Sequence, residues 1–211
     1  MLCSARNSLF LALAFVVGTG AANAQQGLDV FFGVGTASAP SSKTSIDTFN
    51  DGTLYTTPSL KGAFGKAGAD LLITPHFGIN GETDFRFSQG AYAGLSYRPT
   101  FYDFNGVWLP FGDHFKRVVP EFEGGLGGAN IKFFYPSSYC DAFAGCSSSN
   151  QFIESSNHFQ LHMAAGVRVY FTHHLFIRPQ VDAHWVNNFY QFGSNWVPEY
   201  GAALGWSIGS H

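Results

Sequence analysis

The stretch from His158 to Val186, HFQLHMAAGVRVYFTHHLFIRPQVDAHWV, alternates between apolar and polar residues on both sides of a short break at Thr172-His173. Every second residue from Phe159 to Phe171 is apolar, and the alternation resumes from Leu175 to Trp185. Successive side chains of a β-strand point to opposite faces of its sheet. We therefore predict a long hairpin with one apolar face and one face that carries charges of both signs.

The composition favours a membrane protein over a soluble barrel. Charged residues make up 12% of the chain and aromatic residues 17%, whereas charged residues are about 25% of a typical soluble domain. After the N-terminal region no segment approaches the roughly 20 apolar residues that a transmembrane helix needs. A closed β-barrel is the other structure that satisfies its backbone in lipid, with its apolar face outward and its polar face inward.

The N-terminus has the pattern of an export signal. Arg6 precedes an apolar run from Leu9 to Val17, and Ala22-Asn23-Ala24 forms a small-residue cleavage site. We predict that residues 1–24 are a cleaved signal peptide and that 25–211 form one barrel domain in the cell outer membrane. The mature domain would carry 10 basic and 14 acidic residues, and this mild negative charge opposes nucleic-acid binding.

Eight segments can be interpreted as long strands, and their connections alternate in length. Two connections are as short as Thr74-Pro75 and Thr172-His173, whereas the polar segments 38–59 and 136–157 are long. Outer-membrane barrels have short turns at one rim and long loops at the outer rim. The eight predicted strands are 27–37, 60–73, 76–87, a poorly defined strand within 91–109, 118–135, the two strands of the 158–186 hairpin, and 196–208.

Two further features belong to the predicted outer rim. Cys140 and Cys146 lie in the 136–157 loop of an exported chain, which predicts a disulfide that closes a small loop. Aromatic residues near the same rim would supply a girdle at the membrane interface. They are Phe133, Phe134, Tyr135, Phe152, Phe159, Trp185, Phe189, Tyr190, Phe192 and Trp196.

With these features the mature chain resembles the small outer-membrane β-barrel family, whose members are like the OmpA and OmpX transmembrane barrels. The resemblance rests on the export signal, the eight alternating segments, the abundance of glycine and aromatic residues, and stretches such as Ala69 to Gly78 (ADLLITPHFG). It implies an all-β fold: an eight-stranded antiparallel up-and-down transmembrane β-barrel.

The predicted inward faces carry many charges. An eight-stranded barrel is just wide enough for its own side chains, and buried charges must be paired or hydrated. We therefore predict a salt-bridge and water plug rather than an open channel. The residues assigned to it are Lys66, Asp70, Glu82, Asp84, Arg86, Glu121, Glu123, Arg168, Arg178, Asp182, His184 and Glu199.

No cofactor, metal or catalytic site is expected from motif spacing. His158 and His162 would share one face of a helix, but on a strand they lie about 13 Å apart and cannot share a metal ion. The glycines at 124–128 lack the Lys-Ser/Thr pair of a phosphate-binding loop. In a barrel strand such glycines are typical of bending or close packing.

The sequence predicts a non-enzymatic outer-membrane protein with a structural or surface-interaction role. Its partners would be outer-membrane lipids and an extracellular ligand or partner protein that binds the loops at 38–59 and 136–157. Two alternatives remain open. One is a lipid-modifying enzyme resembling lipid A deacylases, and the other is a narrow pore for small solutes. The enzyme would use residues at the outer rim: Glu154, Ser155, Ser156, His158 and His184.

Overall fold

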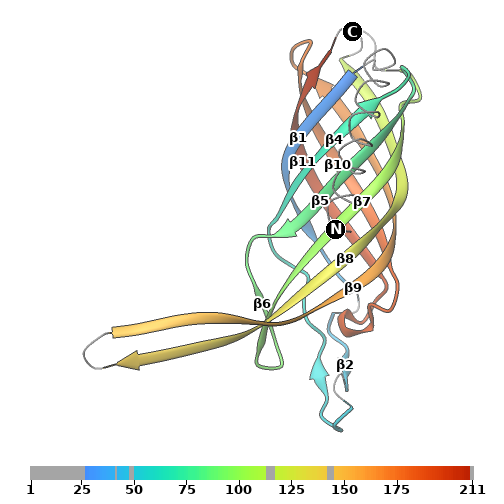
Figure 1. Cartoon of the computed structure of the whole chain (residues 1–211). Helices are drawn as coiled ribbons and strands as arrows, with labels where there is room; N and C mark the ends of the chain where they lie inside the picture. Colours follow the sequence, from blue (N-terminus) through green and yellow to red (C-terminus); the bar gives the residue numbers. More distant parts are fainter. Residues whose placement is uncertain (1–26, 41, 48–49, 113–116, 142–144, 210–211) are drawn as a thin grey trace, which may run out of the picture.

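The computed structural model describes residues 27–40, 42–47, 50–112, 117–141 and 145–209, so the predicted signal peptide lies outside the described residues. Eight long antiparallel strands form a closed barrel (Figure 1), which confirms the predicted fold class. These strands are β1 (Gly27–Ala37), β4 (Phe64–Leu72), β5 (Phe77–Arg86), β7 (Leu95–Trp108), β8 (Val118–Asp141), β9 (Gly145–Tyr170), β10 (Leu175–Val186) and β11 (Trp196–Ile208).

The barrel closes through the pairing of its first and last strands, β1 and β11, with Leu28 opposite Ile208. β5 pairs with β7, the next long strand along the chain. The remaining elements are small: a hairpin of β2 (Ser45–Ile46) and β3 (Tyr55–Thr56), the short strand β6 (Gly90–Tyr92), and the 3-10 turn η1 (Tyr190–Phe192). No helix in the described part of the chain has the length and apolar character needed to cross a membrane.

The two ends of the barrel differ in their connections. At the short-turn end, β4 joins β5 through 73–76, β7 joins β8 through 109–117, and β9 joins β10 through 171–174. At the long-loop end lie the connections 38–63 and 187–195, the β5–β7 connection with β6, and the far ends of β8 and β9. β11 ends at the short-turn end, opposite the hairpin that projects from the barrel (Figure 1).

The outward face is apolar along the strands. Leu161 in β9, Leu126 in β8 and Phe104 in β7 stand opposite one another in the register and are 42–75% exposed. The four tryptophans point outward near the two ends. Trp108 and Trp206 lie at the short-turn end, and Trp185 pairs with Trp196 at the long-loop end. An apolar outer surface with aromatic residues toward its rims is the pattern of a barrel surrounded by lipid.

Two of the short turns are fixed by the same arrangement, a threonine hydroxyl that accepts hydrogen bonds from the backbone. In the β4–β5 turn the Thr74 hydroxyl accepts hydrogen bonds from the backbone N–H groups of His76 (3.3 Å) and Phe77 (2.9 Å). In the β9–β10 turn Thr172 accepts the equivalent bonds from His174 (3.2 Å) and Leu175 (2.9 Å). The threonine fixes each turn, because it satisfies N–H groups that the reversing strands leave without partners.

The prediction that 136–157 forms a loop is wrong. β8 and β9 continue as paired strands to Asp141 and Gly145, so most of this segment forms a two-stranded ribbon that extends beyond the barrel wall (Figure 1). β7 and β10 pair with the barrel part of β8 and β9 but not with the extension, which begins at the pair Tyr135 and Gln151. We call 135–141 with 145–151 the β8–β9 ribbon.

Two local sequence features fit the strands without breaking them. Pro99 lies inside β7, one position beyond the last β5–β7 pair at Thr100, so its missing N–H costs that ladder no hydrogen bond. Gly127 in β8 stands where an added Cβ would lie 1.9 Å from the carbonyl oxygen of Tyr102 in β7. This glycine allows β7 and β8 to approach closely, as expected for the glycine run at 124–128.

Candidate functional site

All twelve charged residues predicted for the interior are buried, with 0–9% of their surfaces exposed. They come from six of the eight barrel strands and point into the lumen. Seven further carboxylate, amide or imidazole side chains that were not among the predicted charges join them there: Asp29, Asn80, Asp103, Asn105, Gln160, His162 and Gln180. The lumen is therefore filled by polar side chains.

Two arginines organise the part of the lumen nearer the short-turn end. Arg168 binds Glu121 through Nε (2.6 Å) and Nη2 (2.8 Å), Asp70 through Nη2 (3.0 Å), and Asp29. Arg178 reaches Glu123 at 3.0 Å, Asp70 and Glu82 at 3.2 Å each, and Glu121 at 3.3 Å. Each fully buried guanidinium thus contacts carboxylates from several strands, which offsets the cost of removing it from water.

A second group lies around Lys66. Its Nζ atom is 3.2 Å from Asp182, 3.3 Å from Glu82 and 3.5 Å from Asp84. His162 lies beside this group, with Nδ1 3.0 Å from the amide oxygen of Asn105 and Nε2 3.2 Å from Asp182. His184 and Glu199 complete the group, with Nε2 of His184 3.8 Å from the Glu199 carboxylate.

Arg86 differs from the other predicted interior charges. Its guanidinium donates to the backbone carbonyls of Ser59 (3.1 Å) and Lys61 (2.6 Å) and to the hydroxyl of Tyr97 (3.3 Å). It therefore ties the long β1–β4 connection to the barrel wall at the long-loop end rather than bridging carboxylates in the lumen.

Sequence reasoning missed Asp103 and the pairing of His162 with His184. Asp103 was missed because the β7 register was ambiguous, although its place between the outward residues Tyr102 and Phe104 is the signal that identifies it. His162 lies directly opposite His184 in the β9–β10 hairpin. That pairing follows from counting outward from the turn at His173.

Apolar side chains close the lumen at both ends. At the short-turn end Leu72, Val107, Leu109 and Val119 form a buried cluster. At the long-loop end a larger cluster includes Phe101, Phe189 and Phe192. The prediction that Phe189 and Phe192 belong to the aromatic girdle is wrong, because the η1 turn folds inward and buries both rings completely. Tyr135, Phe152, Phe159, Tyr190 and Trp196 are exposed.

A small pocket lies at the long-loop rim beside a hydroxyl–imidazole pair. Ser156 Oγ lies 3.0 Å from Nε2 of His158, and Nδ1 of His158 lies 3.1 Å from the carbonyl oxygen of Asn187. The pocket has a volume of about 230 Å³. Its lining residues are Tyr92, Leu95, Phe133, Ile153, Glu154, Ser156, Tyr190 and Gln191. A β-bulge at Phe133/Phe134 inserts Ile153 beside it, and bulges commonly shape such rims.

The structure brings together some of the predicted rim residues and separates others. Ser156 and His158 are hydrogen-bonded, and Glu154 lines the same pocket. Ser155 lies on the opposite face of the strand because side chains alternate. His184 is opposite His162, about four residues or 13 Å farther along the barrel from His158.

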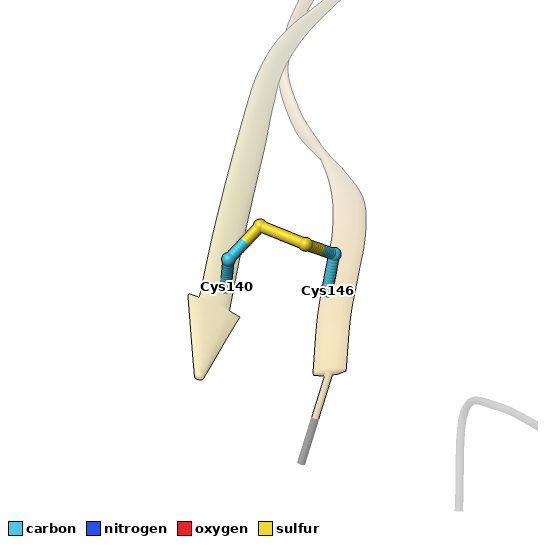
Figure 2. Close-up of a disulfide and its surroundings, with 2 residues drawn as sticks. All are labelled: Cys140 and Cys146. Carbon is cyan, nitrogen blue, oxygen red and sulfur yellow. A yellow bond between two sulfur atoms is a disulfide. The ribbon is translucent and has the colours of Figure 1, made fainter. Parts of the chain in front are cut away.

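The β8–β9 ribbon carries the predicted disulfide, which is confirmed. Cys140 and Cys146 stand opposite each other in the strand register with Cα atoms 4.0 Å apart, and the bond joins the two strands near the tip (Figure 2). Ser137 and Ser149 add a cross-strand hydrogen bond of 2.8 Å. The ribbon is thus held by backbone pairing, by a covalent bond and by side-chain contacts, although it has no core of its own.

No known family model and no curated protein matches this chain. Solved structures do match it over nearly their whole length. OprG from Pseudomonas aeruginosa has a TM-score of 0.55 at 12% identity, covering 88% of this chain and 98% of that one. A major outer membrane protein from Thermus thermophilus has a TM-score of 0.54 at 11% identity, covering 86% and 98%. Neisserial surface protein A has a TM-score of 0.52 at 13% identity, covering 85% and 96%.

At these identities the matches establish the fold. In this chain the fold has an apolar outer surface, a charged lumen, and short turns that alternate with long connections. The expected resemblance to the small outer-membrane barrels is confirmed in architecture. The chain has the eight-stranded antiparallel β-barrel fold of these outer-membrane proteins.

Proposed function

We propose that residues 25–211, after removal of 1–24, form an integral outer-membrane protein without enzymatic activity that binds a partner protein outside the cell. The observation that carries this proposal is the β8–β9 ribbon, a two-stranded projection from the barrel rim. In outer-membrane barrels the short turns face the periplasm and the long connections face outward. By this rule the ribbon projects away from the cell.

The length of the ribbon suits it for contact beyond the lipid headgroups. Seven residues on each strand extend about 24 Å at 3.4 Å per residue. Its two outer edges carry backbone N–H and C=O groups that no neighbouring barrel strand pairs with. Such edges accept a strand from another polypeptide.

The composition of the ribbon favours a protein partner over a polyanion. Asp141 is the one charged residue between Phe134 and Phe152, and the segment includes five serines. Serine, tyrosine and asparagine supply adaptable hydrogen bonds at recognition loops. The disulfide holds the strands in place before binding, which lowers the entropy lost on association.

The lumen supports a scaffold role more than a solute pore. Its centre is filled by ion pairs and both ends carry buried apolar clusters. A solute would have to displace Arg168 or Arg178 from several carboxylates at once.

The test replaces 136–150 with an Asn-Gly turn, which closes a two-residue hairpin on the pair Tyr135 and Gln151. Cells displaying the wild-type or shortened barrel are incubated with an array of extracellular proteins and polysaccharides. We expect wild-type cells to bind at least one protein probe and the shortened barrel to lose that binding while remaining heat-modifiable on gels. Equal binding by both forms, or binding to polysaccharides alone, would overturn the proposal.

A second candidate function is lipid-ester hydrolysis, and the Ser156–His158 hydrogen bond favours it. Nδ1 of His158 faces a carbonyl acceptor, so Nδ1 carries the proton and Nε2 is free to accept one from the Ser156 hydroxyl. This is the arrangement of a serine nucleophile and its base. The apolar pocket beside Ser156 would receive an acyl chain. Glu154 lies on the far side of Ser156 from His158, so a backbone carbonyl replaces the usual orienting acid.

Folded protein in detergent is assayed for fatty-acid release from lipopolysaccharide and from p-nitrophenyl esters. Ser156→Ala is compared with Ser155→Ala, which removes a neighbouring hydroxyl from the opposite strand face. The enzyme candidate requires turnover that Ser156→Ala loses and Ser155→Ala keeps. The non-enzymatic proposal expects no turnover above the blank in any of the three proteins.

A further inference from the structure

His184 is a fully buried histidine whose two ring nitrogens have no hydrogen-bond partner. Its ring is stacked between Phe101, at a centroid distance of 5.1 Å, and His162, at 4.7 Å. This stacking fixes the ring, so that Nδ1 points toward Asp103 and Nε2 toward Glu199, each 3.8 Å from a carboxylate oxygen. These separations are too long for hydrogen bonds.

Two carboxylates beside His184 also accept no hydrogen bond. They are Asp84, which forms only an ion pair with Lys66 at 3.5 Å, and Glu199. One ligand atom from each of Asp84, His184 and Glu199 can be chosen so that all three lie within 4.8 Å of one another. Buried carboxylates without donors are costly, so a cation or a proton is needed among these groups.

The charge balance around the site points to a cation. Glu82, Asp84, Asp103, Asp182 and Glu199 are buried here. Lys66 lies 3.2–3.5 Å from Asp182, Glu82 and Asp84, and Arg178 also pairs with Glu82. Among the described residues, no lysine or arginine pairs with Glu199 or Asp103, so a divalent ion beside Glu199 would supply the positive charge that this side of the group lacks.

We propose that Asp84, His184 and Glu199 bind a divalent transition-metal ion of the zinc class inside the barrel. One imidazole and two carboxylates form an accepted donor set for zinc, with water as the fourth ligand. Ligand atoms about 2.1 Å from a tetrahedral ion lie about 3.4 Å apart. The 3.8 Å between Nε2 of His184 and Glu199 needs a contraction of a few tenths of an ångström.

Asp103 has a positioning role in this site. A zinc-bound histidine usually directs its other N–H toward a carboxylate, which fixes the tautomer. Asp103 stands in that place beside Nδ1 of His184, and the amide of Gln160 holds it through a hydrogen bond of 2.6 Å. His162 is unsuited to bind the ion because hydrogen bonds occupy both of its nitrogens.

The test measures metal content after folding, because apolar clusters close both ends of the lumen. The mature chain is folded in detergent with excess zinc chloride, dialysed against EDTA and analysed by mass spectrometry for bound zinc. We expect about one zinc ion per wild-type barrel and at least about tenfold less in His184→Gln and Glu199→Gln. In Asp103→Asn, affinity should fall about 10- to 100-fold. His173→Ala, which removes an exposed histidine at a turn, should keep full occupancy.

Heat-modifiable migration establishes that each variant has folded. His184→Gln keeps a polar side chain of similar size, and Glu199→Gln removes a charge that has no donor, so both substitutions are compatible with folding. Wild-type protein without bound zinc would overturn the proposal and assign a shared proton to these groups. Zinc retained by both folded variants would overturn it equally, because the ion would then be bound elsewhere.

Discussion

Arg168 and Arg178 each connect several barrel strands through ion pairs inside the lumen. Arg168 contacts carboxylates on β1, β4 and β8, and Arg178 stacks at 3.7 Å over the ring of Phe31 while it pairs with carboxylates on three strands. Removing one partner of such a buried pair leaves the charges of the others without compensation. These side chains therefore matter more to stability than any single surface charge.

Arg168→Met should lower the free energy of unfolding by about 3–5 kcal/mol, because three carboxylates lose their common partner. Urea or guanidinium unfolding from lipid vesicles measures the change. Arg98→Met is the matched control, since Arg98 is exposed on β7 and should cost less than about 0.5 kcal/mol. Similar losses in both variants would show that the lumen pairs add little.

The cost of placing a charge on the outer face near the middle of a strand depends on whether lipid or water surrounds the barrel. Leu126→Arg should destabilise the barrel in lipid by about 2–4 kcal/mol, because it places a charge in the hydrocarbon layer. Phe171→Arg, at the exposed β9–β10 turn, should cost about 0–1 kcal/mol because the interface solvates it. The same vesicle unfolding assay compares them. A cost independent of position would contradict a membrane-embedded outer face.

The alternation of apolar and polar residues predicted which side chains face the lumen, but not which of them contact one another there. Asp182 and His184 were assigned to the lumen from the pattern of β10 alone. The contact of Arg168 with Asp29, 139 residues away, depends on how far the strands are staggered when the barrel closes. That stagger has no local signal in the sequence.

At the scale of single elements, the two threonine turns set the register of their hairpins. A slip of one residue would move every charge of β9 or β10 from the lumen to the outer face. The hydroxyls of Thr74 and Thr172 oppose such a slip, because each receives two backbone N–H groups at the reversal.

Thr172→Ala should therefore cost about 0.5–1.5 kcal/mol per lost hydrogen bond, and Thr172→Ser should restore most of the stability. Thermal or chemical unfolding of the two variants in the same micelles measures the difference. Equal stability of the alanine and serine variants would show that the methyl group, not the hydroxyl, is the important part of the threonine.

The ribbon behaves as an element apart from the barrel. In Cys140→Ser/Cys146→Ser the barrel should keep its unfolding temperature, since the disulfide lies beyond the strands that close the lumen. Limited proteolysis should cut within 136–150 faster than in the wild type, because the ribbon has backbone pairing but no core to restrain it. A large fall in barrel stability would mean that the ribbon and the barrel fold together.

Strand bounds could be predicted where one face of a strand meets the lumen and the other lies outside. β1 and β11 begin and end at the predicted residues, Gly27–Ala37 and Trp196–Ile208. The ribbon was missed because both of its faces are exposed, so pairing imposes no hydrophobic alternation on its serines. β7 was ambiguous because its inward face changes from Asp103 and Asn105 to Phe101 and Tyr97 where it meets the apolar cluster.

The whole molecule is a closed cylinder with a polar centre and apolar seals. The fold class could be predicted because lipid outside and a narrow lumen inside constrain every strand in the same way. The inward turn of Phe189 and Phe192 could not, because a rim loop rich in aromatics suits either a girdle or a seal until its path is known.

Planar-bilayer recordings should show no steady conductance for the wild-type barrel, because the seals and the ion pairs occupy its cross-section. The double variant Phe189→Ser/Phe192→Ser removes much of the seal at the long-loop end and should still conduct little while the arginine ion pairs remain. Stable wild-type channels would show that the lumen side chains move aside in the membrane.

The placement of the four tryptophans makes insertion observable without labels. In the proposed orientation, insertion from one side of a vesicle would carry Trp185 and Trp196 across the whole bilayer and leave Trp108 and Trp206 near the surface they entered. Single-tryptophan versions combined with quenchers confined to one leaflet would then time the passage of each rim. The indole rings at the short-turn end would report docking on the membrane, and those at the long-loop end would report translocation across it.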